Sequence, residues 1–170
     1  AGGDITCNGT FTLQSSTTKY NLSSYTHQTI GVSDINEEIE ISTGTYDADG
    51  DFDATGGEID FTGNGRLQLA GTVTSLATLS DDNGTVEYDG GTQSVLAGTY
   101  YNLEIDQSGN KTTAGTVSTE GDITISGGTL DINGNSLYCA GNFSNAGSLI
   151  SPTTATFYLD GNGTNTNLGG

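Results

Sequence analysis

The sequence EIEISTGTYDADG at residues 38–50 recurs as DITISGGTLDING at residues 122–134, where 7 of 13 positions are identical. A second match, at an offset of 81, pairs residues 3–22 with 84–103, and both stretches end in Tyr-Asn-Leu. Repetition of this kind predicts stacked copies of one structural unit.

The chain starts a third copy of the unit, because ATFYLDGN at 155–162 resembles GTVEYDGG at 84–91. We therefore predict a single β-repeat domain over 1–170, with repeats at about 3–83 and 84–154 and a partial repeat at 155–170. Residues 51–83 are 13 longer than their counterpart 135–154, and we expect the extra residues to form a loop on one face.

Apolar residues recur in pairs two positions apart, with a polar residue usually between them. This alternation predicts short strands that are buried on one side. The pairs are Ile5/Cys7, Ile39/Ile41, Ile59/Phe61, Leu67/Leu69, Val86/Tyr88, Leu103/Ile105, Ile123/Ile125, Leu130/Ile132, Leu137/Cys139 and Phe157/Leu159.

Gly and Asn lie between these strands, as tight corners require, and no window has a helical period. Many short one-sided strands suit a parallel β-solenoid or an antiparallel β-sandwich. The internal repeat favours the solenoid, so we predict an all-β protein of that class.

The net charge of −18, with only 3 Lys and Arg residues, argues against nucleic acid and anionic membrane surfaces as partners. No apolar run approaches the roughly 20 residues of a membrane-spanning helix. The chain begins AGGD without Met, which is typical of a mature end left after processing. We expect an extracellular or cell-surface location, with weak glycosylation signals at Asn8, Asn21, Asn83, Asn110, Asn142 and Asn162.

The stretch 84–149 resembles the β-helical repeats of very large secreted bacterial surface proteins and adhesins. The resemblance lies in GTVEYDG at 84–90, YYNL at 100–103 and GNFSNAG at 141–147. It implies an exported structural or adhesive role. Those proteins are far longer, so a chain of 170 residues needs a cap or a neighbour at each open end.

The clearest candidate for a ligand-binding site is a weak calcium site. Carboxylates spaced like those of an EF-hand loop occur at Asp47, Asp49, Asp51, Asp53 and Glu58. However, Phe52 occupies the position where that loop needs Gly, and flanking helices are not expected. The alternative is a corner of the coil, because Asp131-Ile-Asn133 occupies the same place in the second repeat. No other cofactor is indicated.

Cys7 and Cys139 are disulfide candidates with three alternatives. An internal bridge suits a sandwich, a bridge between stacked subunits suits a solenoid, and two free thiols suit either fold. His27 is the only histidine and cationic residues are few, so we expect that the protein is not an enzyme. A polysaccharide lyase or hydrolase ranks third among the possible functions, after a structural protein and a binding module.

These observations favour an exported structural protein that assembles head to tail into an extracellular filament or surface layer. Its partners are then other copies of itself. The alternative is an adhesin or carbohydrate-binding module of a larger protein, with surface glycans as partners. The expected assembly residues are the two terminal strands, Asp4, Ile5, Thr6, Cys7 and Asn8 with Thr156, Phe157, Tyr158, Leu159 and Asp160.

Overall fold

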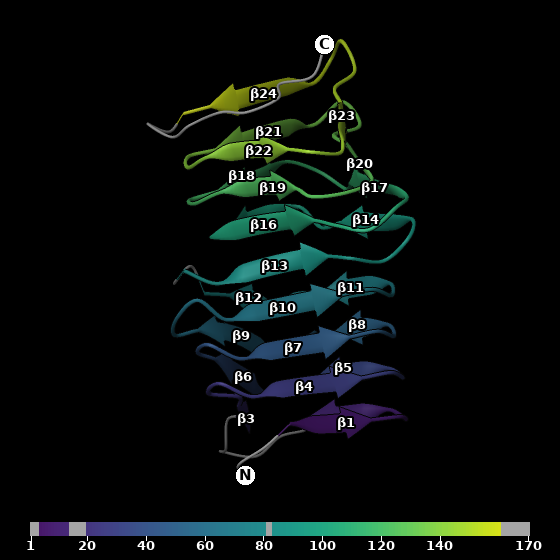
Figure 1. Ribbon diagram of the computed structural model, residues 1–170, viewed down its shortest axis with the longest axis vertical. Helices are drawn as coiled ribbons and strands as arrows, with labels where there is room; N and C mark the ends of the chain where they lie inside the picture. The colour runs from purple at the N-terminus through teal and green to yellow at the C-terminus, as the bar shows by residue number, and fades with distance from the viewer. Residues whose placement is uncertain (1–3, 14–19, 81–82, 161–170) are drawn as a thin grey trace. The chain divides into compact units, whose positions relative to one another are not determined.

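The computed structural model describes residues 4–13, 20–80 and 83–160. These residues form an all-β parallel β-solenoid of about 7 turns, without a helix among them (Figure 1). The predicted fold class is confirmed. The antiparallel sandwich is excluded, because the strands of successive coils pair in parallel.

The chain divides into two compact units, Ala1–Val86 and Glu87–Gly170. The division falls inside strand β13 (Thr85–Tyr88), close to the expected repeat boundary at 83/84. In both units each coil contributes one strand to each of three sheets.

In the first unit, three parallel sheets have the strand orders β1-β4-β7-β10, β2-β5-β8-β11 and β3-β6-β9-β12. Their strands are β1 (Ile5–Cys7), β2 (Phe11–Leu13), β3 (Tyr20–Asn21), β4 (Thr26–Thr29), β5 (Ser33–Ile35), β6 (Glu38–Ile41), β7 (Thr45–Ala48), β8 (Phe52–Asp53), β9 (Glu58–Phe61), β10 (Arg66–Leu69), β11 (Val73–Ser75) and β12 (Thr78–Leu79).

In the second unit, the orders are β13-β16-β19-β22, β14-β17-β20-β23 and β15-β18-β21-β24. The strands that follow β13 are β14 (Gln93–Val95), β15 (Gly98–Tyr100), β16 (Asn102–Ile105), β17 (Asn110–Thr113), β18 (Val117–Thr119), β19 (Ile123–Ile125), β20 (Thr129–Asp131), β21 (Ser136–Cys139), β22 (Phe143–Asn145), β23 (Ser148–Ile150) and β24 (Thr156–Leu159).

The repeating element of the structure is a single coil of three strands, much shorter than the repeat found in the sequence. The coils differ in length, because Thr26 pairs with Thr45 whereas Ile5 pairs with the more distant His27. The match at offset 81 compares equivalent strands, β1 with β13. The match at offset 84 instead compares β6 and β7 with β19 and β20, which occupy different positions in their coils.

The prediction that the longer segment 51–83 holds an extra loop is wrong. The segment contains five strands, β8 to β12, whereas 135–154 contains three, β21 to β23. The extra residues therefore build more of the solenoid, since added backbone is satisfied by pairing with the next coil.

The alternating apolar pairs form the core. In eight of the ten predicted pairs both side chains are buried, and the exceptions are Ile5/Cys7 and Phe157/Leu159 in the first and last described coils. A side chain that points inward is covered by the coils on either side of it, so burial depends on having a coil above and below.

One corner is built from stacked glycines that follow the strands of the β1-β4-β7-β10 sheet. A Cβ atom placed on Gly50 would lie 1.9 Å from the carbonyl oxygen of Gly31, and one on Gly71 would lie 2.4 Å from the carbonyl group of Gly50. The coils approach so closely at this corner that no side chain fits between them.

Candidate functional site

The predicted N-terminal assembly segment, residues 4–8, coincides with β1 and its flanks. Ile5 and Cys7 face inward, because they lie opposite the buried residues His27 and Thr29, yet Ile5 is 39% exposed and Cys7 is half-buried. The inward residues Phe11, Leu13 and Tyr20 of β2 and β3 are also only half-buried. The first described coil therefore leaves the end of the hydrophobic core partly open.

The predicted C-terminal assembly segment, residues 156–160, coincides with β24 and the residue after it. Phe157 and Leu159 lie opposite the buried residues Leu137 and Cys139, but both are only half-buried. The last described coil therefore leaves the end of the hydrophobic core open in part, because Leu149 on β23 is also half-buried whereas Phe143 on β22 is fully buried.

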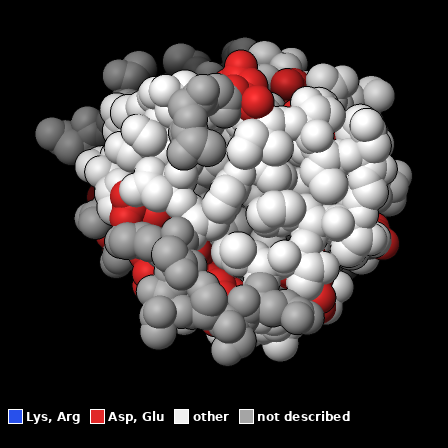
Figure 2. Space-filling model, turned by 90° about the horizontal axis from the view of Figure 1, so that it is seen from below, with Lys and Arg blue, Asp and Glu red and all other residues white. Residues whose placement is uncertain are grey.

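Charged residues are sparse on the end face of the first unit. Figure 2 shows this face, on which uncharged residues occupy most of the visible described surface, Asp and Glu lie toward the edge, and no Lys or Arg is seen. In a chain of net charge −18, a surface with few charged residues is where a like-charged copy is repelled least.

The two terminal strands occupy different positions in their coils. β1 is the first strand of a coil and belongs to the β1-β4 sheet, whereas β24 is the third strand of a coil and pairs with β21. The sequence offset of 152 that aligns Phe157 with Ile5 therefore compares strands that are not equivalent in the solenoid.

Both cysteines are free thiols, so the internal disulfide is not formed. Cys139 is fully buried in β21, and its Sγ lies 3.4 Å from the carbonyl oxygen of Asn142. Burial raises the pKa of the Cys139 thiol, which disfavours the reactive thiolate. Cys7 is therefore the better placed of the two for a bridge between subunits.

The five carboxylates of the predicted calcium loop do not form one cluster. Asp47 lies on β7, Asp49 on the following bend, Asp51 before β8, Asp53 at the end of β8 and Glu58 at the start of β9. No three of them offer oxygens within 4.8 Å of one another.

Three of these carboxylates instead satisfy polar groups at the coil corners. Asp51 accepts a hydrogen bond from the backbone N–H of Thr72 at 2.8 Å, and Asp53 accepts one from the backbone N–H of Thr55 at 2.9 Å. Asp49 accepts one from the side chain of Gln28 at 3.0 Å. Asp53 thus makes the local contact expected of a coil corner, whereas Asp49 and Asp51 bond to neighbouring coils.

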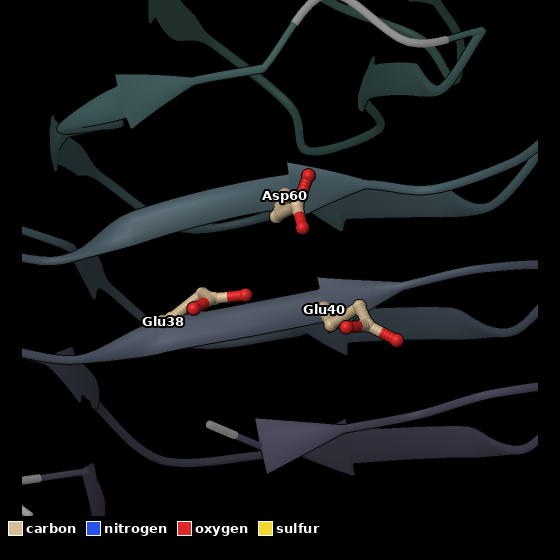
Figure 3. A group of neighbouring side chains, drawn as sticks. All are labelled: Glu38, Glu40 and Asp60. Carbon is tan, nitrogen blue, oxygen red and sulfur yellow. The ribbon is translucent and has the colours of Figure 1, made fainter. Parts of the chain in front are cut away.

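A different acidic group does converge. Glu38 and Glu40 on β6 and Asp60 on β9 have oxygens within 4.8 Å of one another, and Glu40 lies opposite Asp60 in the register (Figure 3). Asn21 on β3 donates its side-chain N–H to Glu40. Sequence reasoning missed this group, which becomes visible only when residues on neighbouring coils are compared.

An open depression of about 350 Å³ lies beside Glu38, over the corner that joins the second and third strands of two coils. Its lining is polar and comprises Asn36, Glu37, Glu38, Gly56, Gly57, Glu58 and Thr78. Carboxylates at this density attract divalent cations from solution. Exposed acidic groups of this kind are also common on solvated surfaces, so the group alone identifies no ligand.

His27, the only histidine, lies in the interior of the first unit and is 1% exposed. Its ring stacks on Tyr46 with centroids 4.8 Å apart. Nδ1 lies 2.7 Å from the hydroxyl of Tyr20, and Nε2 lies 2.8 Å from that of Thr29. Burial lowers the pKa of His27, so the neutral ring is favoured in this aromatic setting.

Lys111 is also fully buried, facing inward from β17. Its ammonium group donates to the backbone carbonyl oxygens of Asp106 and of Gln107, the latter at 3.2 Å. Burial lowers the pKa of Lys111, and the carboxylates of Asp106 and Asp89 oppose this shift. Lys111 thus satisfies backbone carbonyl groups of the corner that precedes β17.

The glycosylation candidates differ in their accessibility. Asn8, Asn21, Asn83 and Asn142 are all exposed, and the side-chain nitrogens of Asn21 and Asn142 donate to Glu40 and Asp122. The side-chain oxygen of Asn110 is buried, and Asn162 lies outside the described residues. Among the described sequons, Asn110 is therefore the one that a glycan reaches least easily.

Comparison with known proteins found no matching protein-family model, curated protein or solved structure. Within the described residues, no helix has the length and apolar character needed to span a membrane.

Proposed function

We propose that this chain is an exported structural protein that stacks end to end on copies of itself, as the subunit of an extracellular filament or surface layer. The observation that carries the proposal is the pattern of core burial. Most inward-facing apolar residues are buried in the inner coils, whereas those of the first described coil and those of β23 and β24 in the last one are only partly covered. Phe143 on β22 of the last described coil is buried.

Another coil in contact with such an end would bury the exposed apolar surface. Burial of apolar surface contributes about 25 cal/mol per Å², and the outermost strands also offer backbone groups that can pair with a further strand. Among the described residues, β1 pairs with β4 and β24 pairs with β21, each on one side.

The contact is heterologous, because the surface on one end differs from the surface on the other. Heterologous contacts related by translation along an axis do not close into a ring, and they give filaments. The sparsely charged end face supports axial contact over lateral contact, since acidic side chains lie toward its edge. The resemblance of 84–149 to repeats of secreted bacterial surface proteins supports export.

The position of each strand in its coil specifies how copies would stack. A neighbour that continues the solenoid would place its β1 beside β22, its β2 beside β23 and its β3 beside β24. This arrangement replaces the simpler idea that residues 4–8 pair with residues 156–160.

Sedimentation velocity and electron microscopy of the whole chain over a range of concentrations test the proposal. We expect polymers that grow with concentration. The variant Ile5→Asp should weaken association by about tenfold or more, because a charge in the contact costs well over the roughly 1.4 kcal/mol that a tenfold change represents. Circular dichroism of the variant verifies that it has folded.

Thr6→Asp is the matched control, since Thr6 lies on the same strand and points outward. It should assemble like the parent chain. Discrete monomers of the parent at high concentration would refute assembly, and monomers that bind glycans would support the adhesin or carbohydrate-binding alternative.

A further inference from the structure

The outward surface of the β15-β18-β21-β24 sheet carries a row of uncharged side chains. The register places Thr99, Ser118, Tyr138 and Tyr158 opposite one another on successive strands. The row ends in two aromatic rings on the last two strands of the sheet, β21 and β24.

The two rings are stacked and accessible. Tyr138 and Tyr158 have centroids 4.6 Å apart and an interplanar angle of 1°. They are 37% and 46% exposed. Stacked aromatic pairs with centroids at this separation attract each other, and the pairing register of β21 with β24 places the two rings side by side.

A second tyrosine pair in the same unit provides a contrast. The hydroxyl oxygens of Tyr88 and Tyr100 are 3.2 Å apart, but both side chains are buried. Tyr25 on the first unit is 38% exposed and does not stack on another described tyrosine. Only Tyr138 and Tyr158 therefore combine a stacked tyrosine partner with access to a reagent, among the described tyrosines.

We propose that Tyr138 and Tyr158 form an oxidative cross-linking site, at which a peroxide-driven one-electron oxidant joins the two rings as dityrosine. Each phenol loses one electron and one proton to give a phenoxyl radical. The radicals couple through a carbon–carbon bond between ring carbons ortho to oxygen. Two ring hydrogens then move to the oxygens, which restores both phenols. Two hydrogens are lost in total, and one peroxide is reduced to two waters.

The bond would fasten β24 to β21 covalently. β24 is the outermost described strand of its sheet and pairs on one side, so it is among the strands most prone to fray. The two cysteines form no disulfide within the chain, and a dityrosine bond would supply a covalent link there. The site does not depend on assembly, because both residues belong to one chain.

The test is treatment of the dilute whole chain with a haem peroxidase and hydrogen peroxide. We expect dityrosine fluorescence in a product that stays monomeric on a denaturing gel. Mass spectrometry of the digested product should show peptides containing Tyr138 and Tyr158 joined together, with the mass of two hydrogens missing.

Tyr158→Phe retains a stacked ring without the phenolic O–H and should abolish the intramolecular cross-link. Tyr25→Phe removes an equally exposed but unstacked phenol and should leave the cross-link unchanged. The proposal is overturned if the parent yields only dimers joined between chains, if the joined peptides contain other tyrosines, or if Tyr158→Phe retains the product. Because the readout is taken on monomers, it is independent of whether the chain assembles.

Discussion

At the level of single residues, the interior of the first unit contains a connected group of buried polar side chains. His27 is held between the hydroxyls of Tyr20 and Thr29. Thr29 in turn lies 3.3 Å from the hydroxyl of Tyr46, which donates to Ser33 at 3.0 Å. The chain of contacts satisfies buried polar groups that would otherwise destabilise the fold. In the sequence His27 stands alone, and nothing there shows that Tyr20 of the preceding coil and Tyr46 of the next one lie against its ring.

The His27 contacts make stability sensitive to mild acid. The pKa of His27 is lowered in the folded chain, so the unfolded chain takes up a proton first as the pH falls through about 6.5. The free energy of unfolding should therefore decrease between about pH 7 and the folded pKa of His27. Its described contacts are Tyr20, Thr29, Phe11 and Tyr46, without a carboxylate among them.

Thermal unfolding of the parent and of His27→Gln at pH 7 and pH 5.5 measures this effect. The parent should lose more stability than the variant over that interval, since Gln does not titrate. Equal losses would show that His27 does not contribute to the pH dependence.

At the level of elements, the strands are too short to be stable singly and depend on close stacking of coils. The glycine corner of Gly31, Gly50 and Gly71 shows how close that stacking is. The abundance of glycine in the sequence predicted tight turns. Only the structure shows which glycines are needed for close approach, because the atoms that a Cβ atom would meet belong to the neighbouring coil.

Substitution at this corner should separate the glycines that allow neighbouring coils to approach closely from those that only form turns. Gly50→Ala should lower the free energy of unfolding by several kcal/mol, because its Cβ atom would overlap the Gly31 carbonyl oxygen. Gly91→Ala is the control, since a Cβ atom there meets nothing within 4 Å. Urea denaturation of both variants measures the difference, and similar losses would contradict the role given to the corner.

At the level of the whole molecule, the proposed assembly depends on which strand of one copy meets which strand of the next. Continuation of the β19-β22 register places Ile5 of the neighbour beside Phe143 and Cys7 beside Asn145. The side-chain oxygen of Asn145 is buried without a hydrogen-bond partner, so replacing it breaks no hydrogen bond to that oxygen. The sequence offset of 152 instead places Cys7 beside Leu159.

Engineered cysteines distinguish these two arrangements. Neighbouring strands are about 4.8 Å apart, which lies within the range that a disulfide accepts. Asn145→Cys should therefore form a ladder of disulfide-linked multimers with the native Cys7 under mild oxidation, visible on a non-reducing gel. Leu159→Cys should form far less. A stronger ladder from Leu159→Cys would support the arrangement indicated by the sequence, and absence of ladders in a chain that polymerises would exclude both.

Local patterns in the sequence were enough to predict the class of fold and the inward-facing side chains, because alternation and glycine-rich corners act over a few neighbouring residues. Eight of the ten predicted apolar pairs are buried as a result. Coil length, the meeting of Glu38, Glu40 and Asp60, and the stacking of Tyr138 on Tyr158 emerged only from the folded chain. These contacts join residues on neighbouring coils, and their partners depend on the length of each coil, which varies along a single sheet.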